Sequence, residues 1–144
     1  MIKEDRSASS TNLDLARVLV VDDDPTSRLT LQTVLEAGGY HVDSAATAAE
    51  AVGKLDDQQY ELVLSDLQME SPQAGLKVLA HARMMDYRPA TALVTTYQDA
   101  LVETSSRSVL IEPEDVAGLL TEVATLLARR VSRQVHRELR HAGN

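Results

Sequence analysis

The stretch that most constrains the fold is a short apolar run that ends in one carboxylate. Leu62, Val63 and Leu64 stand in an unbroken row, which is too short for a helix and lacks the alternation of a half-buried strand. Such a run is typical of a strand buried on both faces of a parallel sheet. Ligands of open parallel sheets bind beyond the carboxyl ends of the strands, so Asp66 is predicted to lie at the mouth of a site. A lone aspartate would more simply cap a loop, and the other strand ends decide between these interpretations.

The rest of the chain alternates between predicted strands and helices. A second buried run, Arg17–Val21, leads into Asp22-Asp23-Asp24-Pro25, where Asp24 and Pro25 have the pattern of a helix N-cap and first helical position. Thr47 and Glu50 form a capping box before another helix. The third helix is predicted to turn Leu76, Leu79 and Ala80 inward and to leave Lys77 and His81 in solvent. The remaining predicted elements are an edge strand over Tyr40–Ala45, strands over Thr91–Thr95 and Val109–Ile111, a weak helix over Gln98–Ser105 and a last helix from near Glu114.

Five strands alternating with five helices predict an α/β fold. Parallel strands joined by right-handed helical crossovers give a doubly wound, five-stranded (βα)5 sheet of the flavodoxin-like type. In that strand order the first and third strands are neighbours, so their carboxyl ends meet at one edge.

Composition bounds the architecture further. A chain of 144 residues suits one domain, and with no Phe and no Trp its core must be aliphatic. The absence of Cys excludes disulfides and thiolate metal sites. No signal peptide and no apolar run near 18 residues is present, so we expect a soluble, cytoplasmic protein without a membrane contact.

Charge divides the chain unevenly. The net charge is −8, yet the segment from Arg129 onward carries five Arg and one acid, which leaves 21 acids and nine Lys and Arg before it. We therefore expect a flexible leader over 1–16, an acidic domain over 17–128 and a basic helical extension over 129–144. The acidic body argues against direct nucleic-acid binding.

Polar groups follow three of the predicted strands: Asp22 and Asp23, then Asp66, then Thr95. Carboxylates that meet at one sheet edge repel each other by roughly 4 kcal/mol at about 4 Å and an effective dielectric near 20. A hard divalent cation, Mg²⁺ or Mn²⁺, is the natural occupant among oxygen ligands. A carboxylate beside such an ion, with a hydroxyl nearby, suits capture of a phosphoryl group by Asp66.

These motifs together resemble the receiver domain of two-component response regulators, over about 17–127. The resemblance rests on Val-Leu-Val-Val-Asp-Asp-Asp-Pro, Leu-Val-Leu-Ser-Asp-Leu-Gln-Met, Leu-Val-Thr-Thr and Ile-Glu-Pro in that order. It implies a signalling domain rather than an enzyme, with at most self-catalysed formation and hydrolysis of an aspartyl phosphate. It also implies a sensor histidine kinase or a phosphotransfer protein as partner.

The resemblance assigns roles to single residues. Asp66 would be the phosphoacceptor, and Asp22 and Asp23 the acidic pair. The ligands of Mg²⁺ would be Asp23, Asp66 and the backbone carbonyl of Gln68, with Asp22 acting through water. Thr95 would be the switch hydroxyl.

The chain departs from the family pattern in several places. Glu112 stands where receivers carry a Lys that pairs with the phosphoryl group, and Val109 stands where they carry an aromatic switch residue. Thr96 replaces a very small residue, and Glu70 replaces a Pro. The stretch between Thr95 and Glu112 is several residues short, which predicts a shortened or absent fourth helix. Arg107 is the basic residue nearest in sequence that could substitute for the Lys.

Two other functions compete with phosphorylation of Asp66. A degenerate receiver could serve as a phosphorylation-independent protein-binding module, which the loss of the Lys favours and the retained acids oppose. Phosphatases of the haloacid dehalogenase type begin with Asp-x-Asp-x-Thr, which 22–26 match, but they also need a downstream Lys and a second acidic pair at a strand end. Neither follows a predicted strand here.

The last helix is predicted to continue past the domain. An inward stripe of Val116, Leu119, Leu120, Val123 and Leu127 is followed by Val131, Val135 and Leu139 at a spacing of four, among the Arg residues. A helix from Glu114 to His141 would be about 42 Å long. We expect this helix to be a partner surface, either in a homodimer or docked on another acidic protein. The alternative is a solvated tail or a linker to a further domain.

Overall fold

The structure is a computed structural model that describes residues 16–66, 69–71, 73–94, 110–111 and 116–142. Its strands are β1 (Arg17–Val21), β2 (His41–Ala45), β3 (Leu62–Asp66), β4 (Ala90–Val94) and β5 (Leu110–Ile111). The described helices are α2 (Pro25–Ala37), α3 (Ala48–Asp57), α4 (Ala74–Arg83) and α5 (Val116–Ala142).

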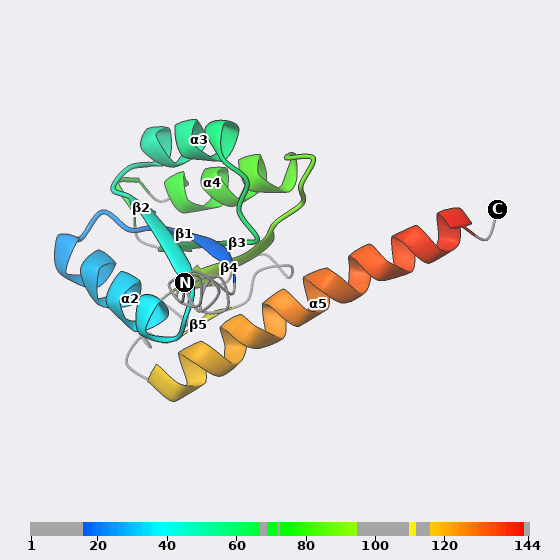
Figure 1. Cartoon of the computed structure of the whole chain (residues 1–144). Coiled ribbons are helices and arrows are strands. Elements are labelled where there is room, and N and C mark those ends of the chain that lie inside the picture. The colour runs from blue at the N-terminus through cyan, green and yellow to red at the C-terminus, as the bar shows by residue number, and fades with distance from the viewer. Residues whose placement is uncertain (1–15, 67–68, 72, 95–109, 112–115, 143–144) are drawn as a thin grey trace, which may run out of the picture.

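The five strands form one parallel sheet in the order β2-β1-β3-β4-β5. Helices α3 and α4 cover one face of the sheet, and α2 and α5 cover the other (Figure 1). This arrangement confirms the predicted α/β fold with β1 beside β3. The predicted helix over Gln98–Ser105 lies outside the described residues, so the complete (βα)5 alternation stays a prediction.

The alternation of side chains along each buried strand divides the core into two layers. Leu62 and Leu64 pack with Leu35 and Leu119 on the α2 and α5 side. Val63, between them, packs on the α3 and α4 side. All three residues of the β3 run are fully buried, as predicted for a strand covered on both faces.

The helices α2 and α3 begin at the N-cap residues that the sequence predicts. Asp24 is the N-cap of α2, and its carboxylate accepts a hydrogen bond from the backbone N–H of Ser27 at 2.9 Å. Thr47 caps α3 by accepting from the N–H of Glu50 at 3.1 Å. The Glu50 carboxylate accepts a hydrogen bond from the N–H of Ala46. In a standard capping box it would accept from the N–H of the N-cap residue itself, Thr47.

The inward face predicted for α4 was right for Leu79 and wrong for Leu76 and Ala80. Leu76 is 40% exposed and Ala80 is exposed, while the buried positions are Ala74, Gly75, Val78, Leu79 and Ala82. Most of these residues are small because α4 lies close against the sheet backbone, and hydrophobicity alone points instead to Leu76.

Two neighbouring side chains also differ from expectation. His81 is half-buried rather than solvated, because its Nε2 lies 2.9 Å from a carboxylate oxygen of Asp56. In α5, Val116 is 47% exposed, and Leu126 takes its place on the buried stripe beside Leu119 and Val123.

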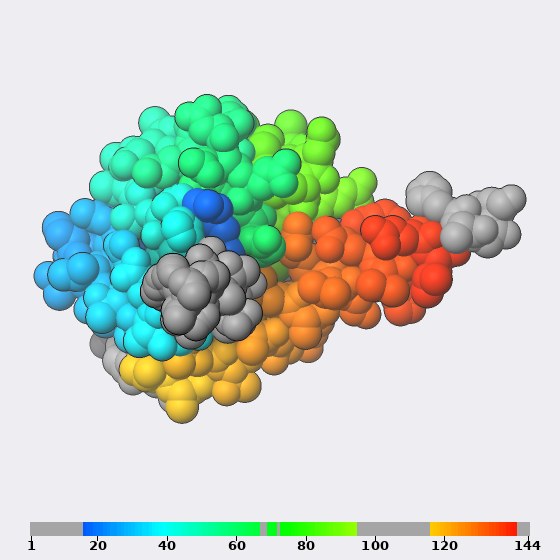
Figure 2. All heavy atoms as spheres, in the orientation of Figure 1, coloured from blue at the N-terminus to red at the C-terminus, as the bar shows by residue number. Residues whose placement is uncertain are grey.

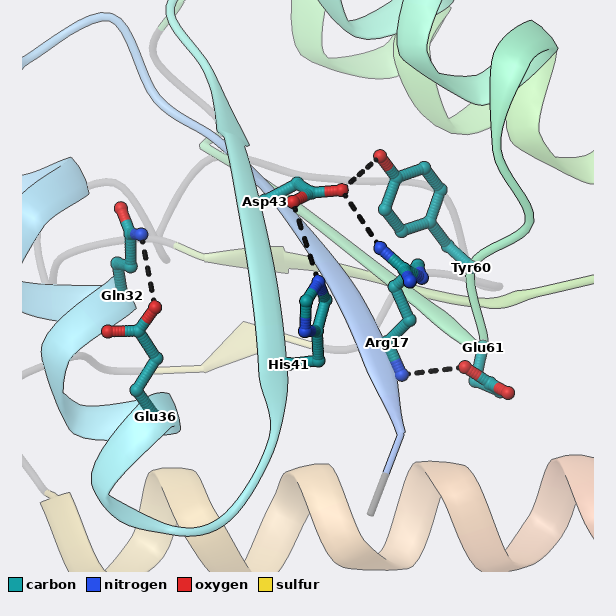
Figure 3. Close-up of polar contacts among 7 residues, drawn as sticks. All are labelled: Arg17, Gln32, Glu36, His41, Asp43, Tyr60 and Glu61. Atoms are coloured by element: carbon teal, nitrogen blue, oxygen red, sulfur yellow. Dashed lines mark hydrogen bonds and ion pairs between the residues drawn. The ribbon is translucent and has the colours of Figure 1, made fainter. Parts of the chain in front are cut away.

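A polar cluster joins β1, β2 and the entry to β3 at the amino-terminal side of the sheet (Figure 3). The hydroxyl of Tyr60 donates to Asp43 at 2.7 Å, and Arg17 lies 3.5 Å from the same carboxylate oxygen. Tyr60 is 1% exposed, and burial, followed by the contact with Asp43, raises the pKa of its hydroxyl. The backbone N–H of Arg17 donates to Glu61. These groups are satisfied by each other, so we assign the cluster a structural role.

Candidate functional site

The carboxyl ends of β1 and β3 lie side by side. Val21 pairs with Ser65 in the parallel register, so the residues that follow, Asp22 and Asp66, reach the same edge of the sheet. Asp23 continues the turn toward α2. One carboxylate oxygen from each of Asp22, Asp23 and Asp66 lies within 4.8 Å of the other two. The structure therefore brings together the three acids that the sequence singles out, and we call them the acidic cluster.

The members of the cluster differ in exposure. Asp22 is 3% exposed, Asp66 is half-buried and Asp23 is exposed. Burial raises the pKa of the Asp22 carboxyl. Hydrogen bonds from the Asp24 N–H, at 3.0 Å, and with the Asp66 side chain oppose that rise, while the charges of Asp23 and Asp24 add to it. Two carboxyl groups share a hydrogen bond only when one is protonated, so the pair needs either a proton or a cation.

The three consecutive aspartates have separate tasks. Asp24 caps α2, and its N–H holds the carboxylate of Asp22 in place. The Arg28 guanidinium, one turn into α2, donates to the backbone carbonyl of Asp22 at 2.8 Å. These contacts fix the Asp22 backbone and side chain together, and Asp23 is the exposed member of the acidic cluster.

Gly75 is a functional-site residue that the sequence interpretation missed. A Cβ atom at this position would lie 2.5 Å from the backbone oxygen of Asp66 and 3.2 Å from the hydroxyl of Ser65. A real Cβ does not approach backbone so closely, so α4 can lie against the end of β3 only with glycine here. The sequence signal was a glycine inside a helical pattern a few residues after the strand-end aspartate.

Glu70 has a contact that its sequence position did not predict. Its carboxylate accepts a hydrogen bond from the N–H of Ala48 at 3.2 Å, at the start of α3. The other predicted site residues and family departures lie outside the described residues: Gln68, Thr95, Thr96, Arg107, Val109 and Glu112.

The donor set of the acidic cluster fits a hard divalent ion. Three carboxylates converge, one of them buried, and no thiolate or imidazole accompanies them in the described part of the cluster. Such oxygen-only sites are typical of Mg²⁺.

The sequence model of one protein family, described as "response regulator receiver domain", matches residues 18–109. The chain belongs to this family. Receiver domains are signalling domains of response regulators in two-component systems. TrrA of Thermotoga maritima, solved in complex with Mg²⁺–BeF, is 28% identical to this receiver domain. The match has a TM-score of 0.67 and covers 78% of this chain and 99% of that one.

Curated relatives of this receiver domain are longer proteins. The gliding motility regulatory protein of Myxococcus xanthus is 36% identical over 78 residues, which are 54% of this chain and 10% of that protein. The transcriptional regulatory protein PrrA of Mycobacterium bovis is 28% identical over 127 residues, which are 85% of this chain and 54% of that protein. PhyR of Brucella abortus shares the fold, with a TM-score of 0.72 at 20% identity over 94% of this chain and 58% of that one.

The chain thus spans about half or less of the length of these curated relatives. Among the described helices, none is both long and apolar enough to cross a membrane.

Proposed function

We propose that this receiver domain accepts a phosphoryl group on Asp66 in a Mg²⁺-dependent reaction and signals through protein contacts. The observation that carries the proposal is the convergence of Asp22, Asp23 and Asp66 within 4.8 Å at the carboxyl edge of the sheet. The difference in exposure supports Asp66 over Asp22 as the nucleophile, because Asp22 is 3% exposed and a phosphodonor needs access. That choice also argues against a phosphatase of the haloacid dehalogenase type, in which Asp22 would attack.

The transfer is a displacement at phosphorus. An oxygen of the Asp66 carboxylate forms a bond to phosphorus while the bond from phosphorus to the donor's leaving atom breaks, and its electron pair stays with the donor. Hydrolysis removes the phosphoryl group from Asp66. Water attacks the phosphorus, the bond from phosphorus to the Asp66 oxygen breaks, and Asp66 leaves as carboxylate. The transferred phosphoryl group places extra negative charge beside Asp22 and Asp23, and hydrolysis removes that charge as phosphate.

The acidic cluster would hold the metal. Asp23, Asp66 and the backbone carbonyl of Gln68 are the proposed ligands, with Asp22 acting through water. When bound, Mg²⁺ or Mn²⁺ supplies positive charge that offsets both the carboxylates and the incoming phosphoryl oxygens. Asp22 keeps its orientation through the Asp24 N–H, so the site is organised before the ion arrives.

Two further residues are proposed to tune the reaction. Thr95 follows β4 directly and would donate its hydroxyl to a phosphoryl oxygen. Glu112 follows β5 directly and would place a carboxylate where the family has an ammonium group, which disfavours the phosphorylated state.

The proposed partners follow from the same assignment. A sensor histidine kinase or phosphotransfer protein would supply the phosphoryl group to a receiver unit over 17–128. We further propose that a second copy of this chain covers the apolar stripe of α5 at Val131, Val135 and Leu139, which are 53%, 45% and 64% exposed. Four side chains per protomer, Leu127 included, would contribute roughly 1.5–3 kcal/mol each before the cost of association.

Beryllofluoride binding tests the assignment of the site. Met69 is 8% exposed and lies three residues after Asp66, so we expect its ¹³C-methyl NMR signal to respond to a change at the acidic cluster. We expect beryllofluoride to shift this signal only when Mg²⁺ is present. Asp23→Asn should abolish the shift, whereas Asp57→Asn, which removes an exposed acid at the end of α3, should retain it.

The competing function gives a different result. A phosphorylation-independent binding module needs no metal, so its Met69 signal would stay unchanged with Mg²⁺ and beryllofluoride. An unchanged signal in the wild-type protein would contradict the proposal and favour that function.

A further inference from the structure

A second site lies at the end of the sheet opposite the acidic cluster. A groove of about 650 Å³ separates the loop between α4 and β4 from the first part of the α5 extension. Its floor includes Ala90, the first residue of β4, whereas Asp66 pairs with Val94 at the other end of that strand. Four residue steps along a strand span roughly 13 Å. The groove is therefore separate from the proposed phosphorylation site.

The wall that α5 contributes is fixed to the loop. The guanidinium of Arg130 donates to the backbone carbonyls of Arg88, at 3.0 Å, and Tyr87, at 2.8 Å. Arg88 has a φ of 46°, a left-handed conformation that residues other than glycine rarely adopt. The two bonds from Arg130 help to hold this conformation. They also join the loop to α5, so that the two walls of the groove lie side by side (Figure 2).

The groove is strongly basic. Arg129, Arg133 and Arg137 lie one turn apart on the α5 wall, over a length of roughly 12 Å. Arg88 and Arg83 are exposed on the loop side. Asp86 is the single acid among the described lining residues. Guanidinium groups in such a row match a series of carboxylates or phosphates.

Apolar side chains complete the lining. Pro89 and Ala90 are buried at the floor, and Met84 at the rim is 75% exposed. Methionine side chains adapt to varied apolar partners. The combination favours a ligand that carries both acids and an apolar side chain, as a polypeptide does.

The Arg row and the apolar stripe lie on different faces of α5. Successive helical residues are about 100° apart around the axis, which puts Arg129, Arg133 and Arg137 on roughly the opposite side from Val131 and Val135. A second copy of the chain on the apolar stripe would thus leave the groove open.

We propose that this groove binds an acidic polypeptide segment of a partner protein. Charge complementarity selects a short acidic segment over nucleic acid. Residues before Arg129 carry 21 acids against nine Lys and Arg, so a long polyanion that left the groove would meet an acidic body. A short segment need only fill the groove. The inference is independent of whether Asp66 is phosphorylated.

Methionine NMR gives a direct test with a short oligo-glutamate peptide as probe. Of the four Met in the chain, Met84 and Met85 line the groove, and Met69 lies outside it, three residues after Asp66. We expect the peptide to shift the Met84 and Met85 methyl signals and to leave Met69 unchanged. Binding should weaken at higher salt.

Charge reversal identifies the residues responsible. We expect Arg133→Glu with Arg137→Glu to weaken peptide binding by at least about tenfold, and Arg140→Glu, a single charge reversal outside the lining, to weaken it by less than about twofold. An unchanged Met69 signal would show that the fold is intact, and Arg133→Gln with Arg137→Gln provides a milder version.

Four results would overturn the proposal: no shift at Met84 and Met85, equal loss in Arg140→Glu, tighter binding of a single-stranded oligonucleotide of equal charge, or a concentration-dependent shift at Met84 and Met85 without peptide. The last would make a second copy of this chain the occupant.

Discussion

At the scale of single residues, three carboxylates that repel one another converge in the acidic cluster, and we propose that a bound cation offsets this repulsion. Asp22 is almost fully buried beside Asp66 and Asp23, and burial raises the pKa of its carboxyl. The sequence was sufficient to predict this convergence, because consecutive strand ends carried acids and neighbouring parallel strands share an edge. Sequence could not reveal that Asp22 is the buried member, since burial depends on how the Asp24 turn folds over it.

Neutralising Asp22 should therefore have opposite effects with and without metal. Without Mg²⁺ we expect Asp22→Asn to raise the free energy of unfolding, because a buried charge among acids is removed. Wild-type protein should gain stability as Mg²⁺ is added, and the variant should gain less. Chemical denaturation at several Mg²⁺ concentrations measures both effects. Equal stabilisation of the two proteins would contradict a role for Asp22 at the metal.

The charge of Glu112 provides a second prediction. A carboxylate in the position of the family's ammonium should repel beryllofluoride, so Glu112→Lys should strengthen its binding by roughly tenfold or more, or about 1.4 kcal/mol. The measurement is a titration of the Met69 methyl signal with beryllofluoride in the presence of Mg²⁺. Glu112→Gln should give an intermediate affinity. Unchanged affinity in the Lys variant would mean that Glu112 does not act on the site.

At the scale of secondary-structure elements, sequence periodicity predicted the strands and helix caps but not how closely α4 packs. The β3 run and the Asp24 and Thr47 caps depend on local chemistry, which a sequence contains directly. The buried face of α4 depends on its distance from the sheet, and that distance favours small residues such as Ala74 and Gly75 over Leu76.

A matched pair of glycine substitutions tests that packing. Gly75→Ala should lower both the free energy of unfolding and the affinity for beryllofluoride, because its Cβ would lie 2.5 Å from the Asp66 backbone oxygen. Gly53→Ala in α3 meets no atom within 4 Å and should stabilise the protein by about 0.5–1 kcal/mol, since alanine is the better helix former. Thermal unfolding and beryllofluoride titration of both variants provide the comparison. Similar stabilisation of the two would contradict the close approach of α4.

At the scale of the whole molecule, α5 extends well beyond the sheet it covers (Figure 1). Apolar periodicity in the sequence predicted the length of this helix. It could not predict the basic groove, because Arg83 and Arg88 join Arg133 and Arg137 only through tertiary packing. Opposite ends of one sheet thus hold the acidic cluster and a basic groove.

Removal of the α5 extension should convert a dimer to a monomer. A truncation after Arg130 keeps the two hydrogen bonds from Arg130 to the α4–β4 loop and deletes Val131, Val135 and Leu139. We expect light scattering to give the mass of two chains for the full-length protein and one for the truncated form. As a milder control, Val135→Glu should also weaken the dimer. A full-length chain that is monomeric at high micromolar concentration, with or without beryllofluoride, would rule out this dimer.

The proposed reaction is the transfer of a phosphoryl group to Asp66 with the help of Mg²⁺. Its most direct test is the intact mass of the protein after treatment with acetyl phosphate. We predict the mass increase of one phosphoryl group in the wild-type protein with Mg²⁺, none with excess EDTA, and none in Asp66→Asn, while Asp57→Asn is labelled like the wild type. Labelling that persists in Asp66→Asn, or a wild-type protein that is never labelled, would contradict the proposal.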